Sequence, residues 1–293
     1  MPRLRFALAS LLLAIVLLAR PEVAGAATTK VIFVAISDIY QMSEQAGRGG
    51  MARLAAIEAG DEKWVRSLSA YPNKVTQKLL DTIAEHASLV KYIDMPLQHA
   101  SANVLKRMKR GANGDIFLKL LERIRRTIPG VAIRTSMIVG FPGESDADFE
   151  ELSQFVDAAQ FDRLGVFSYS DEDTSKSFEL DQKVAPGTIH RRKRSLMARQ
   201  RKISRARNRL LKGQVLPVLV EGPTPDSDLV WQARLSTQAP EIDGVCYISD
   251  PGEAPLTAGQ IRRMRITKAH DYDLTGELVD TPPTPSKLLQ ILQ

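Results

Sequence analysis

Cysteine is almost absent from this sequence of 293 residues, because Cys246 is the only one. A single thiol excludes an internal disulfide, a zinc site of the usual kind and a cubane iron–sulfur cluster held by this chain. Cys246 lies in an apolar run from Gly244 to Ile248 that is typical of a strand. We therefore predict that it is a small buried side chain with no chemical role.

The sequence also lacks an apolar run long enough for a comfortable membrane span. The run from Phe6 to Ala19 is too short, and Arg20 ends it. With Arg3 and Arg5 before it and small residues at 24–26 after it, the segment 1–26 resembles a secretory signal. Taken alone it predicts export, whereas the chain after residue 64 favours the cytoplasm. A wrong start or a rearranged reading frame is the alternative interpretation of this segment.

The positive charge is unevenly distributed. The formal net charge is +6, and ten Lys and Arg residues fall between His190 and Leu210. Such a stretch can meet a polyanion such as RNA, or it can be one solvated face of a helix. With 44% apolar residues, the chain is large enough for one full domain and a small one.

Short apolar strands alternate with helices in the first two-thirds of the chain. We expect strands at 30–37, 64–71, 90–95, 131–139 and 164–169, and helices at 76–86, 101–111, 115–126 and 145–159. Ser101 should cap the second of these helices, and Ser145 with Asp148 resembles a capping box at the start of the fourth. This alternation predicts βαβ units and a parallel sheet. A complete eightfold barrel needs about 250 residues, so the region fits an incomplete α/β barrel.

A long helix is expected from Pro186 to Leu211. Apolar residues recur every seven positions in it, at Ile189, Leu196, Ile203 and Leu210. The narrow apolar seam should pack on the barrel and leave the arginines in water.

After Gly213 the pattern changes to short β runs, at 215–221, 230–235, 245–249, 261–269 and near Leu278. This spacing predicts a small antiparallel β-barrel. The predicted organisation is a signal-like segment at 1–26, a partial barrel at 27–185, a basic linking helix at 186–212, the β-barrel at 213–280 and a disordered tail at 281–293.

Several motifs resemble the radical-SAM methylthiotransferases. They are the Tyr71-Pro72 pair, DMPLQHAS at 94–101, LKRMKR at 105–110 and RTSMIVGFPGE at 134–144. One branch of that family modifies a tRNA adenosine, and the RimO branch modifies an aspartate of the small-subunit ribosomal protein S-twelve. PLQHAS, APEIDG at 239–244 and HDYDL at 270–274 resemble the RimO branch. The resemblance covers about 64–279, and the tRNA branch stays the alternative.

This resemblance implies a cytoplasmic enzyme that uses S-adenosylmethionine and a 4Fe-4S cluster. It identifies the small β-barrel as a TRAM module and implies the ribosomal protein or the small subunit as partner. In the family, three cysteines in a CxxxCxxC loop hold the cluster, and no such motif occurs here. Because thiolates are the ligands, we expect a truncated form without radical chemistry of its own, unless another chain supplies the cysteines.

The resemblance also implies contacts with S-adenosylmethionine at the carboxyl ends of two strands, where such barrels bind ligands. The candidates are Gln98, His99, Arg134, Ser136, Gly140 and Phe141.

Two of these candidates and two neighbouring residues have a structural alternative. Gly140 and Gly143 can serve only the turn, and His99 can be a capping or packing residue. Glu144 is better explained by the start of the following helix, where an acidic group interacts favourably with the helix dipole.

Two other functions remain open at this point. A non-catalytic fragment could bind ribosomes or RNA through the basic helix and the barrel, where aromatic and basic residues gather: Trp231, Tyr247, Arg262, Arg263 and Arg265. If the signal-like segment is genuine, the chain is instead an exported α/β protein.

Overall fold

The computed structural model describes residues 64–67, 70–87, 89–173, 175, 177–252 and 255–279. The predicted strand at 30–37, the signal-like segment and the predicted tail lie outside them. No helix in these ranges combines the length and the apolarity needed to cross a membrane.

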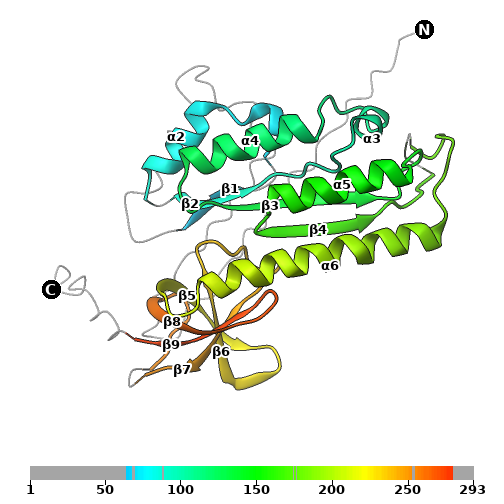
Figure 1. Cartoon of the computed structure of the whole chain (residues 1–293). Coiled ribbons are helices and arrows are strands. Elements are labelled where there is room, and N and C mark those ends of the chain that lie inside the picture. The colour runs from blue at the N-terminus through cyan, green and yellow to red at the C-terminus, as the bar shows by residue number, and fades with distance from the viewer. Residues whose placement is uncertain are drawn as a thin grey trace, which may run out of the picture. The chain divides into compact units, whose positions relative to one another are not determined.

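Four parallel strands form the first sheet, in the order in which they occur along the chain (Figure 1). They are β1 (Val65–Ser67), β2 (Leu89–Asp94), β3 (Ala132–Val139) and β4 (Arg163–Ser168). Helical segments connect successive strands, so the predicted βαβ units and parallel sheet are confirmed.

The connecting helices cover one face of this sheet. They are η2 (Pro72–Lys74), α2 (Gln77–Glu85), α3 (Ala102–Arg107), α4 (Gly114–Thr127) and α5 (Asp146–Ala159). In α4, Phe117, Leu121 and Ile124 recur at helical spacing and are buried, and the Asn113 side chain accepts the Ile116 N–H at 3.0 Å. That cap satisfies one of the unpaired donors at the helix start.

The alternation along β3 separates the two faces of the sheet. Ile133, Thr135, Met137 and Val139 are fully buried, and the apolar members of this set belong to the core that the helices cover. The residues between them, Arg134, Ser136 and Ile138, are only partly buried. Because successive side chains of a strand point to opposite faces, the second face carries the polar groups; we call it the open face.

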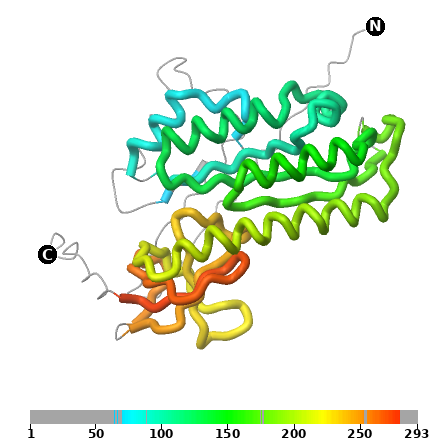
Figure 2. The backbone as a smooth tube through the Cα atoms, viewed as in Figure 1, coloured from blue at the N-terminus to red at the C-terminus, as the bar shows by residue number. Residues whose placement is uncertain are grey.

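Helix α6 (Pro186–Leu210) runs alongside β4 and ends beside the β-barrel (Figure 2). Leu196 and Ile203 are buried in the core, as the heptad pattern predicts. Leu210 is 74% exposed, so its predicted place in the seam is wrong: the helix ends there and the chain turns into the barrel. The prediction that the arginines lie in water is also wrong for Arg192, which is buried.

The remaining strands form a closed barrel in the order β5-β6-β7-β9-β8. They are β5 (Val215–Thr224), β6 (Ser227–Leu235), β7 (Cys246–Asp250), β8 (Ile261–Ala269) and β9 (Leu274–Leu278). The prediction of an antiparallel barrel holds for every pair except β7–β9, which is parallel. The reason is that β9 pairs with β8 as a hairpin and inserts between β8 and β7.

Cys246 is fully buried in the core of this barrel. Burial raises the pKa of its thiol to about 12, and Sγ donates a hydrogen bond to Gln238 Oε1 at 3.2 Å. The predicted burial of Cys246 is confirmed. Only the thiolate is a nucleophile or a metal ligand, so the raised pKa favours the lack of a chemical role, which stays a prediction.

The predicted capping box at the start of α5 is present, with Ser145 and Asp148 bonded reciprocally. Ser101, predicted to cap α3, occupies the N-cap position, but its hydroxyl donates to Asp148 Oδ1 at 2.5 Å instead of capping. Burial alone would raise the pKa of Asp148, but hydrogen bonds from Ser101, Ser145 and Asn103 outweigh it and lower the pKa to about 2. Asp148 thus joins two loops of the sheet.

We expect Asp148→Asn to destabilise the protein by about 2 kcal/mol at neutral pH, because the charge-assisted bonds are lost. The folded pKa lies below the unfolded value of about 4. The stabilisation is therefore present above about pH 4 and is lost as the pH falls through about 2. Denaturant unfolding at several pH values measures this difference. Glu151→Gln, at an exposed position of α5, is the control; equal effects of both changes would contradict the assignment.

Candidate functional site

Two of the predicted contact residues, Arg134 and Ser136, lie on the open face of β3, and a third, Gln98, is bonded to the same strand through its backbone. The Gln98 N–H donates to Ser136 O at 2.9 Å, and the Ile138 N–H donates to Gln98 O at 2.8 Å. Gln98 has a φ of 75°, which is uncommon for a residue with a side chain. These bonds attach the backbone of Gln98 to β3 beside Met137 and place Gln98 next to Ser136 along that strand.

Arg134 lies on the same face, one alternation before Ser136. Its Nη1 donates to Asp94 Oδ1 at 2.9 Å, and its Nε lies 3.8 Å from Asp243 Oδ1. Asp94 ends the neighbouring strand, and its Cα is the register partner of Arg134. The guanidinium is thus already balanced by two carboxylates, one of them from the barrel part of the chain.

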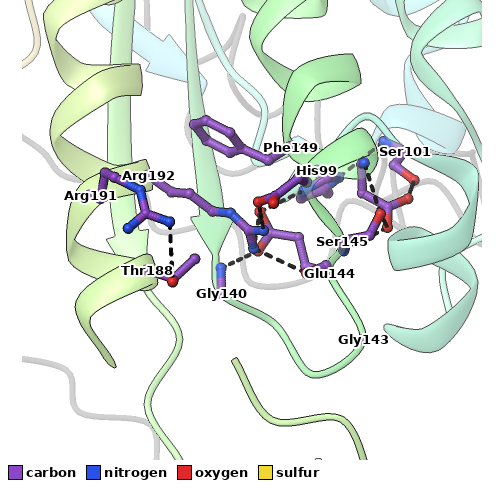
Figure 3. Close-up of polar contacts among 12 residues, drawn as sticks. His99, Ser101, Gly140, Gly143, Glu144, Ser145, Phe149, Thr188, Arg191 and Arg192 are labelled. Carbon is purple, nitrogen blue, oxygen red and sulfur yellow. Dashed lines mark hydrogen bonds and ion pairs between the residues drawn. The ribbon is translucent and has the colours of Figure 1, made fainter. Parts of the chain in front are cut away.

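His99 has a different environment, inside a buried polar cluster (Figure 3). Its Nδ1 accepts the Ser101 N–H at 3.0 Å, which leaves the proton of a neutral imidazole on Nε2. Nε2 faces Glu144 Oε1 at 3.8 Å. The His99 side chain is 0% exposed, whereas Gln98 and Arg134 are only partly buried.

Glu144 is the centre of this cluster, and its side chain is also 0% exposed. It accepts a hydrogen bond from the Gly140 N–H and lies 3.5 Å from Arg192 Nη1. A buried carboxylate needs such partners, because the cost of removing an unpaired charge from water is several kcal/mol. The charge therefore has a packing role here beyond the predicted interaction with the helix dipole.

Arg192 of α6 supplies the compensating charge. It donates to the Glu144 backbone oxygen at 3.0 Å and to Asp146 Oδ1 at 2.7 Å, and its guanidinium lies 5.5 Å from the centre of the Phe149 ring. The sequence prediction missed this residue. A signal was present, because Arg192 lies three residues after Ile189 and four before Leu196, on the same side of the helix as the apolar seam.

Gly140 and Phe141 end β3 and are packed by the segment that follows β4. Gly140 has a φ of 81°, and a Cβ there would collide with the side chain of Ile189. Phe141 is buried and meets Tyr169 edge-on, with ring centroids 5.3 Å apart. These contacts explain both residues as parts of a close-packed turn, and their role in cofactor binding stays a prediction.

Residues 236–243, which we call the strap, cover the other end of the open face. Arg66 of β1 donates to Ser236 O and Gln238 O, both at 2.7 Å. Burial lowers the pKa of Arg66 to about 10, and the neighbouring charge of Arg234 adds to this. The Arg66 guanidinium also lies 5.0 Å from the centre of the Tyr92 ring.

Asp243 anchors the end of the strap. It accepts the Tyr92 hydroxyl at 2.8 Å and the Ala239 N–H at 2.8 Å. Ala239 packs in a small apolar cluster with Val90, Tyr92 and Ala132 of the open face. Burial and the adjacent Asp243 carboxylate raise the pKa of Tyr92 well above its usual value, so it stays a donor.

The residues present fit the two implied cofactors differently. Gln98 and Ser136 offer an amide and a hydroxyl that are not fully buried, a donor set that suits the polar groups of S-adenosylmethionine. A 4Fe-4S cluster needs three thiolates, and Cys246 is the only cysteine. In the described ranges, no group of three or more His, Cys, Asp or Glu side chains is arranged to hold a metal ion. The chain therefore does not fit the cluster.

The residues proposed for RNA contact on the barrel are not all accessible. Trp231 is half-buried and packs against the barrel core, whereas Tyr247 and Arg263 are exposed. Arg265 is paired with Glu277 at 2.9 Å. Arg262 is 1% exposed, so its predicted contact with RNA is wrong. It lies on β8, beside β5, and its side chain is buried there.

Comparisons with known proteins agree with this architecture. The family model of the radical SAM superfamily matches residues 47–156, and that of the TRAM domain matches residues 213–279. A curated protein of Solibacter usitatus, named ribosomal protein uS12 methylthiotransferase RimO, is 70% identical over 236 residues, covering 80% of this chain and 51% of that protein. Over four-fifths of its length the chain is therefore similar to this RimO protein, and it matches the radical SAM and TRAM models.

A second relative has the same printed name. It comes from Koribacter versatilis and is 54% identical over 230 residues, covering 78% of this chain and 45% of that protein. The chain thus spans about half the length of the curated RimO relatives it matches. A solved structure described as the radical SAM enzyme HemN of Escherichia coli superposes with a TM-score of 0.43 at 13% identity, over 59% of this chain and 46% of that chain. The similarity to RimO proteins is seen in the sequence comparisons.

Arg192→Gln should destabilise the protein by about 3 kcal/mol, because it leaves the Glu144 carboxylate buried without its cation. The neighbouring Arg191→Gln removes an exposed arginine of the same helix, and we expect it to stay within about 0.5 kcal/mol. Urea unfolding of both variants measures the difference. Matching losses of stability would refute the compensating role of Arg192.

Tyr92→Phe tests the strap. Removing the hydroxyl leaves the Asp243 carboxylate with one donor fewer, and we expect a loss of about 1–2 kcal/mol. Amide hydrogens of residues 238–245 should then exchange faster with solvent than in the native protein. Tyr247→Phe, on the exposed side of the barrel, is the matched control. Unchanged exchange in Tyr92→Phe would show that the strap is held by other contacts.

Proposed function

We propose that this chain is the radical-SAM and TRAM part of a methylthiotransferase that modifies an aspartate of ribosomal protein uS12. The observation that carries the proposal is the identity of 70% over 236 residues with the RimO protein of Solibacter usitatus. The relatives described above are named for uS12, which favours this substrate over a tRNA adenosine.

In this proposal the open face binds S-adenosylmethionine at the carboxyl ends of β2 and β3. Gln98 and Ser136 hold its polar groups, and Arg134, kept in place by Asp94 and Asp243, offers guanidinium donors beside them. The cofactor, when bound, supplies the sulfonium chemistry. Gly140 and Phe141 shape the adjacent turn, and His99 supports it from the buried cluster.

The cluster that the family reaction needs is not provided by these residues. Three thiolates are required, and the single cysteine is buried with a pKa of about 12. We therefore propose that this chain by itself carries out no radical chemistry and that cysteines outside this sequence supply the cluster. The proposed location is the cytoplasm, where the ribosomes are; fractionation of the native host distinguishes it from export.

Binding and chemistry are tested separately on the purified chain. We expect it to cosediment with small ribosomal subunits that contain uS12 and less with subunits lacking that protein. After anaerobic incubation with iron and sulfide, we expect no cluster absorption, and with S-adenosylmethionine added the mass of uS12 should not change. Equal cosedimentation with subunits that contain uS12 and with subunits that lack it would contradict uS12 as the substrate. A brown protein that cleaves S-adenosylmethionine would overturn the need for outside cysteines.

A further inference from the structure

The outward side of α6 carries a line of cations and no acid. Among its 25 residues, Pro186–Leu210, there is no Asp or Glu. The exposed cations of α6 and of the residue pair that follows it, which we call the basic stripe, are Arg191, Arg194, Arg201, Lys202, Arg205, Arg209 and Lys212. With about 3.6 residues per turn, they lie within an arc of about 100°. Arg191 and Arg209 are about 27 Å apart along the helix.

The arginines at the edges of α6 are used differently from those of the basic stripe. Arg199 is paired with Asp157, and Arg207 lies 2.6 Å from Asp162. These two pairs tie the helix to α5 and to the loop before β4. The arginines at the edges of α6 therefore hold the helix against the rest of the chain, as the buried Arg192 does.

The cations of the basic stripe have few partners inside the protein. Asp271 lies 3.3 Å from Arg205 and 3.9 Å from Arg201, and Arg191 donates to the Thr188 hydroxyl. Arg194, Lys202, Arg209 and Lys212 have no ion pair with any described residue. Several of these cations are spaced by three or four positions, where like charges repel one another. A helix face that serves only solvation usually intersperses acids.

We propose that the basic stripe binds the phosphate backbone of RNA. A regularly charged polyanion relieves the repulsion along the whole line and releases its own counterions. Five of the seven cations are arginines, whose planar guanidinium matches two phosphate oxygens at once. The choice of ribosomal RNA beside the substrate protein rests on the proposed function.

Other anionic partners fit this surface less well. An anionic membrane takes up amphipathic helices with large apolar residues beside the cations, but Leu196 and Ile203 of α6 are buried against the sheet. A protein partner normally needs apolar or aromatic anchors at the centre of the interface. The outward side of α6 offers one large apolar side chain, Leu210, at its very end.

The test compares two triple variants of the full chain in binding to naked small-subunit ribosomal RNA. The first is Arg194→Gln, Lys202→Gln and Arg209→Gln, which neutralises the basic stripe. The second is Lys78→Gln, Lys119→Gln and Arg126→Gln, which removes the same charge from exposed positions of α2 and α4. Gln has nearly the helix propensity of Lys and Arg, and circular dichroism checks that both variants fold.

We expect the first variant to bind at least about tenfold more weakly in low salt, since each lost phosphate contact lowers affinity. The slope of log K against log salt should fall by about 2 to 3. The second variant should keep the affinity and the slope of the native chain. Anionic vesicles are the competing probe, and we expect only weak binding to them.

Three results would overturn the inference. They are no RNA binding at low salt, an equal loss of affinity in the two variants, and stronger binding to anionic vesicles than to RNA. The uS12-dependent cosedimentation reports on the proposed function, because it compares subunits with and without that protein. If the chain does not bind RNA but still cosediments more with subunits that contain uS12, the inference is wrong and the proposed function stands.

Discussion

A buried charge pair determines how the two parts of the described chain are joined. The Glu144 carboxylate lies in the core beside the turn that ends β3, and it can remain ionised there only with a cation at hand. Arg192 provides that cation from a helix that begins beyond β4. Because Arg192 also bonds to the Glu144 backbone oxygen and to Asp146, one side chain holds the amino-terminal end of α6 against the loop. Beyond this attachment, Leu196 and Ile203 of α6 are buried in the core of the sheet.

The strap provides a second attachment, at the opposite end of α6. Tyr92 and Arg66 of the sheet bind Asp243 and the backbone of residues 236–238, while Asn208 near the end of α6 donates to His270 O at 3.2 Å. The barrel is therefore connected to the sheet through polar bonds as well as through the helix. The open face keeps its polar groups accessible only toward the carboxyl ends of its strands. Cofactor contacts are expected at that edge in a parallel α/β structure.

The separation between the open face and the buried cluster divides the candidate residues into two kinds. Gln98 and Ser136 are partly exposed, and Arg134, whose side chain is 14% exposed, is held by Asp94 and Asp243. His99 and Glu144 form the packed layer behind, and their fully buried side chains stabilise the turn that carries Gly140. Residues that are neighbours within one sequence motif thus have different roles, and their burial distinguishes these roles.

Features that depend on neighbouring residues could be derived from the amino-acid sequence. The capping box of Ser145 and Asp148, the length of α6 and the β runs of the barrel follow from local hydrogen bonds and from spacing, so they could be predicted. Arg192 with Glu144, Tyr92 with Asp243 and Ser101 with Asp148 join residues 47 to 151 positions apart. No local pattern specifies such partners. These partners are set by the tertiary structure. Burying a charge or a hydroxyl costs free energy when packing removes water, and that cost is offset by the partner that the fold brings near.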